Sequence, residues 1–214
     1  MIKFFDELLD WIYKKKCYIC GRSKESLKIC SECYNKLYFN DFRSLKIIEG
    51  VDIYSAGTYT NELQKMIRGL KYHRQKELAF YLAKFLAEYW LKLNMGDAFQ
   101  VIPVPLHKNR RRKRGYNHME LVADEFCKIT GYKKNLALIS RIKDTVAQYK
   151  LTYNKRIQNL ENAFSVDKEN LNDMPILIID DITTTGATFE SMVKELRKSG
   201  VENKIICLSI SNPE

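Results

Sequence analysis

The sequence predicts an α/β domain with a largely parallel sheet, preceded by a small cysteine-rich module. Strand-like runs alternate with stretches of helical periodicity along most of the chain, the pattern of a doubly wound sheet flanked by helices. One run, PILII at 175–179, is continuously apolar, as expected for a strand buried on both faces. Two CxxC pairs lie upstream of this alternation. We therefore expect a module over 1–45 and the α/β domain over 46–214.

The first half of the chain contains four predicted elements. Residues 1–16 form an amphipathic pattern with one apolar face, which indicates a helix. The run 51–60 has the composition of a strand and follows a turn signal at Glu49-Gly50. Apolar residues at helical spacing then predict two helices, over 61–72 and 78–89.

The second half continues the alternation. FQVIPVP at 99–105 reads as a buried strand, because its two prolines exclude a helix. A helix is expected around 119–126, and the long polar stretch after it shows no clear period. The strand at 175–179 is followed by a helix over 189–196 and a last strand over 204–210.

Composition indicates a globular protein with a basic surface. No stretch approaches the roughly 20 apolar residues that span a bilayer, and the acidic residues near the N-terminus are unlike a signal peptide. Lysine and arginine total 36 against 26 acidic residues, a formal charge of +10. We expect a cytoplasmic protein without a membrane span, compatible with a polyanionic partner, nucleic acid first.

The cysteines near the N-terminus predict a metal site. Two CxxC pairs separated by nine residues supply four thiolates, which suit tetrahedral zinc at about 2.3 Å. An iron–sulfur cluster has no extra support in the sequence. The module either only folds this end of the chain or also brings its lysines to nucleic acid. The expected ligands are Cys17, Cys20, Cys30 and Cys33.

The stretch KNRRRKR follows the strand at 99–105 and is cationic at six of its seven positions. Placed as a mobile loop at the edge where open α/β sheets bind ligands, it can close over a pyrophosphate or grip a nucleic-acid backbone. A solvated basic run and a localisation signal are the simpler alternatives. The six cationic residues are Lys108, Arg110, Arg111, Arg112, Lys113 and Arg114.

The segment LIIDDITTTGATFE places two acidic residues directly before a turn that is suited to bind an anion. The apolar run ends in Asp180 and Asp181, and a threonine-rich turn with Gly186 then leads into a helix. Such a turn offers backbone N–H groups to a phosphate, and glycine permits close approach. The two carboxylates would repel that phosphate, so they suit adjacent hydroxyls of the same ligand, or a metal ion bridging them. The chemistry indicates a phosphorylated sugar with a diol.

These residues carry a resemblance to a known family. ILIIDDITTTGAT resembles the phosphoribosyl-pyrophosphate (PRPP) motif of type I phosphoribosyltransferases. Further motifs resemble the ComF (ComFC) family over nearly the whole chain: CYIC…CSEC, YSAGTYTNELQKMIRGLKY, VIPVPLHKNRRRKRGYNH, and R-x3-T-x2-Q-x2-L from Arg141 to Leu151 followed by NAF. The resemblance implies a zinc module joined to a type I phosphoribosyltransferase-like domain, whose parallel sheet is flanked by helices.

The resemblance also assigns roles. Asp180 and Asp181 would hold the ribose hydroxyls of PRPP, bound with Mg²⁺, and Asp181 is the candidate catalytic residue. Lys71 and Tyr72 lie where the pyrophosphate loop is expected, and the basic stretch lies where the flexible loop is. His118 stands where glutamine is expected. The expected 5′-phosphate ligands are Thr183, Thr184, Thr185, Gly186, Ala187 and Thr188.

The function implied by the family is a competence factor that aids uptake and cytoplasmic handling of single-stranded DNA. Its implied partners are single-stranded DNA, PRPP and a helicase of the same uptake system, which would bring it to the inner face of the membrane. Tyr116, Tyr149 and Tyr153 are candidate stacking platforms, or core residues. The alternative is an active phosphoribosyltransferase with an unidentified acceptor. A third reading makes PRPP a regulatory ligand only.

Overall fold

The computed structural model describes residues 16–23, 27–144, 160 and 162–213. Residues 1–15 of the helix expected over 1–16 lie outside the described residues, as do Tyr149, Tyr153 and the part of the R-x3-T-x2-Q-x2-L motif from residue 145 onward. Among the described helices, none is both long and apolar enough to cross a membrane.

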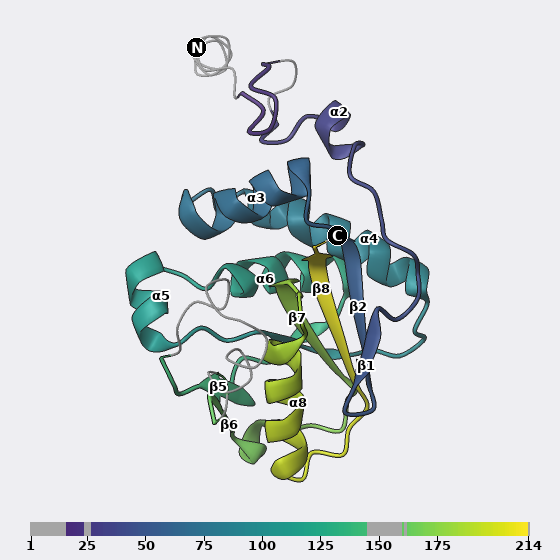
Figure 1. Cartoon of the computed structure of the whole chain (residues 1–214), viewed down its shortest axis with the longest axis vertical. Coiled ribbons are helices and arrows are strands. Elements are labelled where there is room, and N and C mark those ends of the chain that lie inside the picture. Colours follow the sequence, from purple (N-terminus) through teal and green to yellow (C-terminus); the bar gives the residue numbers. More distant parts are fainter. Residues whose placement is uncertain (1–15, 24–26, 145–159, 161, 214) are drawn as a thin grey trace, which may run out of the picture.

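The main sheet confirms the predicted α/β class (Figure 1). Every neighbouring pair from β2 to β4 is parallel, and β1 alone runs antiparallel at one edge. In spatial order its strands are β1 (Lys46–Ile48), β2 (Val51–Thr58), β8 (Ile205–Asn212), β7 (Ile176–Ile182), β3 (Gln100–Pro103) and β4 (Lys133–Lys134).

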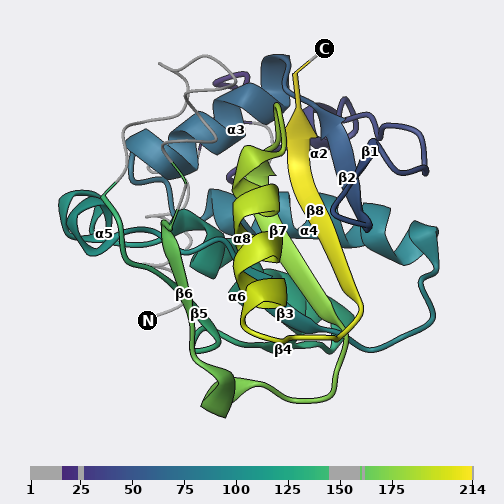
Figure 2. The same cartoon turned by 60° about the horizontal axis from the view of Figure 1, so that its bottom comes forward.

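Helices cover both faces of this sheet. The described residues pack into two apolar clusters, one containing α3, α4 and α6, and the other containing α8 with the small β5–β6 sheet (Figure 2). The elements beside the six strands are α2 (Ser31–Tyr34), α3 (Asn61–Tyr72), α4 (Leu78–Leu93), α5 (Lys108–Arg114), α6 (His118–Thr130), β5 (Ile139–Arg141), β6 (Phe164–Val166), the short helix η2 (Lys168–Asn170) and α8 (Ala187–Lys198).

Strand β7 shows why the sequence requires two covered faces. Leu177 and Ile179 belong to the cluster with α4 and α6, whereas Ile176 and Ile178 belong to the cluster with α8. Alternate side chains of a strand point to opposite faces, so a continuous apolar run needs a helix layer on each side. All four residues are fully buried.

The structure differs from the sequence prediction at the end of β7 and at β1. Strand β7 continues through Ile182, so the two aspartates lie within the strand rather than after its end. The edge strand β1 was not predicted; it pairs with β2 through a tight turn at Glu49-Gly50, where both residues have positive φ, 51° and 70°. A run of three residues is too short for its sequence pattern to indicate a strand. The hydrogen bonds to β2 stabilise the extended conformation instead.

The strand order reverses direction between β3 and β7. From β3 the chain crosses one face through α6 to reach β4, whereas from β7 it crosses the other face through α8 to reach β8. The two connections leave in opposite directions, and in open α/β sheets ligands commonly bind at the carboxyl ends of strands beside such a reversal. The acid pair lies in the last residues of β7, and α5 and α6 follow the end of β3.

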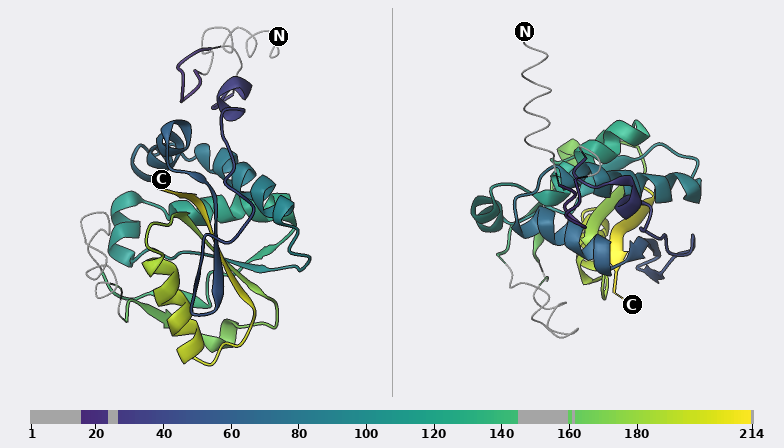
Figure 3. Two further views of the ribbon diagram at one scale, coloured as in Figure 1. Left: turned by 45° about the vertical axis from the view of Figure 1, so that its right-hand side comes forward. Right: turned by 90° about the horizontal axis from the view of Figure 1, so that it is seen from above.

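The described part of the cysteine module packs at the end of the molecule where α3 lies (Figure 3). Cys17, Ile29, Cys30 and Cys33 are buried in the same cluster as Leu70 of α3. The division of the chain at residue 45 stays a prediction.

Candidate functional site

Two aspartates of β7 form the centre of the site, and their environments separate their acidities. Burial raises the pKa of Asp180 to about 7, and the neighbouring charge of Asp181 adds to this effect. Burial also opposes ionisation of Asp181, but Lys71 and His118 outweigh it and hold its pKa well below the usual range. Near neutral pH the pair therefore combines one ionised carboxylate with one carboxyl that binds and releases a proton.

Asp181 receives two partners from different helices. Its Oδ2 contacts Nζ of Lys71, from the last turn of α3, and Nε2 of His118, the first residue of α6. Asp181 and His118 are each only 5% exposed. Strand, helix end and helix start thus meet at one buried carboxylate, in a place where an unpaired charge would be costly.

The chain of contacts continues to the basic stretch. Nη1 of Arg114 lies 2.6 Å from Nδ1 of His118. A guanidinium only donates hydrogen bonds, so Nδ1 accepts and Nε2 carries the proton that is donated to Asp181. Burial lowers the pKa of His118 to about 4, which is consistent with this neutral tautomer. Arg114, His118, Asp181 and Lys71 form one connected network.

The threonine-rich turn links β7 to α8. Gly186 precedes the helix with φ of 81°, in the left-handed region that favours glycine. A side chain there would also collide with Ile48 of β1, whose Cδ1 lies 2.6 Å from an ideal Cβ. The N–H of Thr183 donates to the carbonyl of Ser211 in β8 at 2.9 Å, which holds the start of the turn against that strand. The predicted phosphate ligands therefore occupy a defined turn at the N-terminus of α8.

The basic stretch is a short helix, α5, instead of the expected loop. His107 caps it by accepting a hydrogen bond from the Asn109 N–H at 3.3 Å, and Gly115 ends it with φ of 86°. Four basic residues lie in its last turn, where the negative end of the helix dipole stabilises positive charge. Sequence reasoning missed this helix because a buried histidine is an uncommon cap.

The side chains of α5 have different surroundings. Arg111 pairs with Glu120 at 2.8 Å, and Arg114 joins the network described above. Arg114 also lies over the ring of Tyr72, at 5.7 Å from its centroid, and Tyr72 is 56% exposed. Arg114 thereby contacts both Tyr72 and His118, and His118 in turn contacts Asp181, which Lys71 also contacts. Lys108, Arg112 and Lys113 are exposed, and Arg110 is partly buried.

Tyr116 is a core residue rather than an exposed stacking platform. It is 8% exposed, and its hydroxyl donates to the carbonyl of Leu70 in α3. This contact braces the segment that carries Lys71 against the start of α6.

The four cysteines of the module converge as predicted. Their Sγ atoms all lie within 4.8 Å of one another, and Sγ of Cys20 lies 3.8 Å from Sγ of Cys30. Thiolates at about 2.3 Å from a tetrahedral zinc are about 3.8 Å apart, so the arrangement fits that ion. Hydrogen bonding from Arg22 lowers the pKa of the Cys20 thiol to about 6, which favours the thiolate that a metal requires.

No protein-family model matches the chain. The chain is 31% identical to Competence protein F of Haemophilus influenzae over 198 residues, which cover 87% of this chain and 86% of that protein. It belongs to the ComF/ComFC family.

Further ComF relatives show similar coverage. The chain is 25% identical to DNA utilization protein YhgH of Salmonella typhimurium over 202 residues, covering 90% of this chain and 88% of that protein. It is 25% identical to Competence protein ComFC of Bacillus subtilis over 185 residues, covering 86% of this chain and 72% of that protein.

Among solved structures, this ComF protein is similar to two phosphoribosyltransferases. For the hypoxanthine phosphoribosyltransferase of Staphylococcus aureus the identity is 14% and the TM-score 0.38, covering 65% of this chain and 75% of that chain. For the adenine phosphoribosyltransferase of Thermoanaerobacter pseudethanolicus the identity is 14% and the TM-score 0.34, covering 64% and 83%.

Three site residues of this ComF protein were missed or left without a role by sequence reasoning. His118 was seen only as a departure from an expected glutamine, and it is a partner of Asp181. Arg141 of β5 lies over the Phe164 ring at 5.6 Å and acts electrostatically on Asp180. Lys46 of β1 reaches the turn, where its ammonium donates to the carbonyl of Thr185. Each is placed by tertiary contacts that no local pattern indicates.

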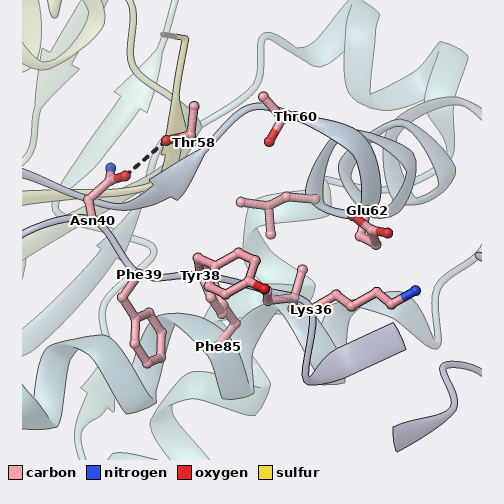
Figure 4. A pocket seen from close by; sticks show the side chains of 10 residues that line it. Lys36, Tyr38, Phe39, Asn40, Thr58, Thr60, Glu62 and Phe85 are labelled. Carbon is pink, nitrogen blue, oxygen red and sulfur yellow. Dashed lines mark hydrogen bonds between the residues drawn. The ribbon is translucent and has the colours of Figure 1, made fainter. Parts of the chain in front are cut away.

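A separate cavity of about 240 Å³ lies between residues 36–40 and the start of α3 (Figure 4). Its wall includes Tyr38, which is 80% exposed, and Asn40, which accepts a hydrogen bond from the Thr58 hydroxyl at 3.0 Å. None of the residues predicted for the PRPP site lines this cavity. The lining residues are Lys36, Leu37, Tyr38, Phe39, Asn40, Thr58, Thr60, Glu62, Leu63 and Phe85.

Proposed function

We propose that this ComF protein aids the uptake and cytoplasmic handling of single-stranded DNA, and that it binds PRPP at the carboxyl ends of β3 and β7. The observation that carries the PRPP assignment is the joint placement of the acid pair, the glycine turn and Lys71 at the ends of these strands. The DNA role rests on relatives named for competence and DNA utilization.

The ligand we infer has three parts, and each part meets a matching group. The ribose diol donates hydrogen bonds to the acid pair, in which Asp181 is held ionised. The 5′-phosphate occupies the turn from Thr183 to Thr188, at the positive end of α8. The pyrophosphate lies toward Lys71 and Arg114, which are linked to Asp181 through the buried network.

Mg²⁺ fits this proposal as a companion of the pyrophosphate. The carboxylate oxygens of the acid pair are hard ligands of the kind that Mg²⁺ prefers. Because Lys71 and His118 already contact Oδ2 of Asp181, we expect PRPP oxygens to supply most of the coordination. The ion would neutralise charge on the pyrophosphate.

Single-stranded DNA is the partner we infer for the exposed cations of α5. Lys108, Arg112 and Lys113 are exposed beside the site and offer charge to a phosphate backbone. A helicase of the same uptake system, with the contact to the inner face of the membrane that it would bring, remains an expectation from the family resemblance.

A second function, phosphoribosyl transfer, is favoured by the separated acidities of Asp180 and Asp181. In that reaction the bond from ribose C1 to pyrophosphate breaks and a bond from C1 to the acceptor forms. The acceptor loses a proton in this step. Asp180 in its ionised form would take up that proton, because its pKa is near neutral. Positioning and charge stabilisation supply the remainder of the catalysis.

Pyrophosphate release decides between these functions. Zinc-loaded protein is incubated with PRPP and Mg²⁺, with and without single-stranded DNA, and Asp181→Asn serves as the comparison. Release that disappears in the variant supports the transferase. DNA binding that weakens with salt and on neutralising α5, with PRPP bound but not consumed, supports the binding protein or a regulatory role for PRPP. If folded protein binds neither PRPP nor DNA, both proposals fail.

A further inference from the structure

We propose that Lys46 is a further ligand of the 5′-phosphate, and that with the turn before α8 it forms a site selective for a phosphate monoester. The inference deepens the proposed function and rests on it, because it concerns the same turn. Neither the PRPP motif nor the sequence prediction includes this lysine, which lies 139 residues from its contact in the chain.

The β1–β2 hairpin brings Lys46 to the turn. Lys46 pairs with Ile53 and Ile48 pairs with Val51, so the two β1 side chains lie on the same face of the strand. Both face Gly186: an ideal Cβ on that glycine would lie 2.6 Å from Cδ1 of Ile48 and 2.9 Å from Nζ of Lys46. The hairpin therefore covers the turn directly, with an ammonium group over its glycine.

Lys46 has no direct salt-bridge partner among the described residues. Its ammonium donates to the Thr185 carbonyl, and no carboxylate of the described residues makes a salt bridge with it. The nearby acid, Glu190, is held by Lys194 at 2.7 Å. Burial lowers the pKa of Lys46, although Glu190 opposes this effect. A half-buried cation at the N-terminus of a helix opposes the helix dipole, so it suits an anion that is not part of the chain.

Thr183 gives a second, independent sign of a ligand. It is 3% exposed, and its Oγ1 is buried without a hydrogen-bond partner among the described residues. A buried hydroxyl left unpaired costs stability unless something outside the chain pairs with it. This donor lies in the same turn as the carbonyl that Lys46 contacts.

These donors indicate the class of anion. A phosphate monoester is close to dianionic at neutral pH and offers three acceptor oxygens, which suit an ammonium, a hydroxyl and the N–H groups of the turn. A phosphodiester of DNA carries one charge and continues in both directions, whereas β1 and Gly186 close the turn on one side. We therefore expect sugar 5-phosphates to bind here, and DNA to bind elsewhere on the protein.

The test uses ribose 5-phosphate, which carries the phosphate and the diol without the pyrophosphate. The zinc-loaded full chain is titrated calorimetrically as wild type, Lys46→Met and Lys46→Arg. Lys198→Met is the matched control, because Lys198 is an exposed lysine at the opposite end of α8. Lys46→Met should weaken the affinity about 10- to 100-fold, the usual loss for a charge-assisted hydrogen bond. Lys46→Arg and Lys198→Met should stay within about threefold of wild type.

Two further measurements distinguish a role of Lys46 in ligand binding from a role in stabilising the fold. Affinity for inorganic pyrophosphate, assigned to Lys71, should be unchanged in Lys46→Met. The melting temperature of ligand-free Lys46→Met should rise, because an unfavourable charge is removed. Equal ribose 5-phosphate affinity in wild type and Lys46→Met would overturn the inference and leave PRPP binding intact. Wild-type protein that binds neither ribose 5-phosphate nor PRPP would overturn the proposed function as well.

Discussion

Arg114 donates from Nη1 to Nδ1 of His118 at 2.6 Å, and this contact fixes how His118 meets Asp181. With Nδ1 as the acceptor, a neutral His118 has its one proton on Nε2, directed at the carboxylate. Protonation would place an N–H of His118 against an N–H of Arg114. The basic helix α5 and the acid pair are therefore coupled through the tautomer of one buried histidine.

Replacing His118 tests that coupling. Glutamine can donate to Asp181 through its amide N–H₂ and accept from Arg114 through its carbonyl, so His118→Gln should change the free energy of unfolding little at pH 7. His118→Leu removes one of the two partners of Asp181 and the acceptor of Arg114, and should cost about 1–3 kcal/mol. Urea unfolding measures both variants, and equal losses for glutamine and leucine would contradict the hydrogen-bond network.

The pH dependence of stability gives a second test of His118. Its native pKa of about 4 is below the ordinary histidine value of 6.5, so the unfolded chain binds a proton in this range and the native protein does not. Wild type should therefore lose stability relative to His118→Gln as the pH falls from 6.5 toward 4. The difference between the two unfolding curves isolates this residue, and a constant difference over that range would contradict the buried neutral histidine.

The contribution of Asp180 to stability should change with pH in the opposite direction. Its native pKa of about 7 lies above the ordinary aspartate value of 3.8, so the native protein keeps a proton that the unfolded chain loses. The native protein therefore loses stability as the pH rises from about 4 to 7, and Asp180→Asn removes this loss. The variant should gain stability relative to wild type across that range and hold the gain above pH 7. A gain that is absent at pH 8 would contradict the raised pKa of Asp180.

Lys71→Met should destabilise the protein strongly. The substitution removes the ammonium from a buried carboxylate, and breaking such a pair typically costs about 3–5 kcal/mol. Lys84→Met is the matched control, because Lys84 pairs with Glu88 at 3.8 Å on the exposed face of α4 and should cost less than about 1 kcal/mol. Chemical denaturation of the two variants gives the comparison, and similar losses would show that Lys71 is not a buried partner of Asp181.

The cysteine module is expected to support the α3 end that carries Lys71. The Tyr18 hydroxyl lies 2.8 Å from Nδ1 of His73, and an ideal Cβ on Gly69 would lie 2.8 Å from that hydroxyl. We expect one zinc per chain, and chelation should speed amide hydrogen exchange in residues 69–73. Cys127→Ser should keep the zinc, because Cys127 belongs to α6. Unchanged exchange after zinc removal would separate the module from the site.

The parts of the fold that repeat a pattern were predictable from sequence. PILII indicated a doubly buried strand, and the spacing of Leu63, Ile67 and Leu70 indicated the helix that the structure shows as α3. Short elements were not predictable, because β1 depends on its pairing with β2, and α5 on a cap from buried His107. Local propensity is weak over so few residues, and tertiary contact decides their conformation.

The site was predictable in its residue types and only partly in its contacts. The acid pair and the glycine turn are contiguous in sequence, so their chemistry could be read directly. The partners of Asp181 come from α3 and α6, and Lys46 comes from β1, so their placement depends on the strand order. A single sequence carries no signal for such pairings.

The most direct test of PRPP binding is a calorimetric titration of zinc-loaded protein with PRPP in the presence of Mg²⁺. Wild type should bind one PRPP per chain, and ribose 5-phosphate should compete for the same site. Asp181→Asn, checked for folding by circular dichroism, should bind at least about tenfold more weakly, because it loses the ionised acceptor for the ribose diol. Absence of binding to folded wild type, or equal affinity in the two proteins, would contradict the assignment of this site to PRPP.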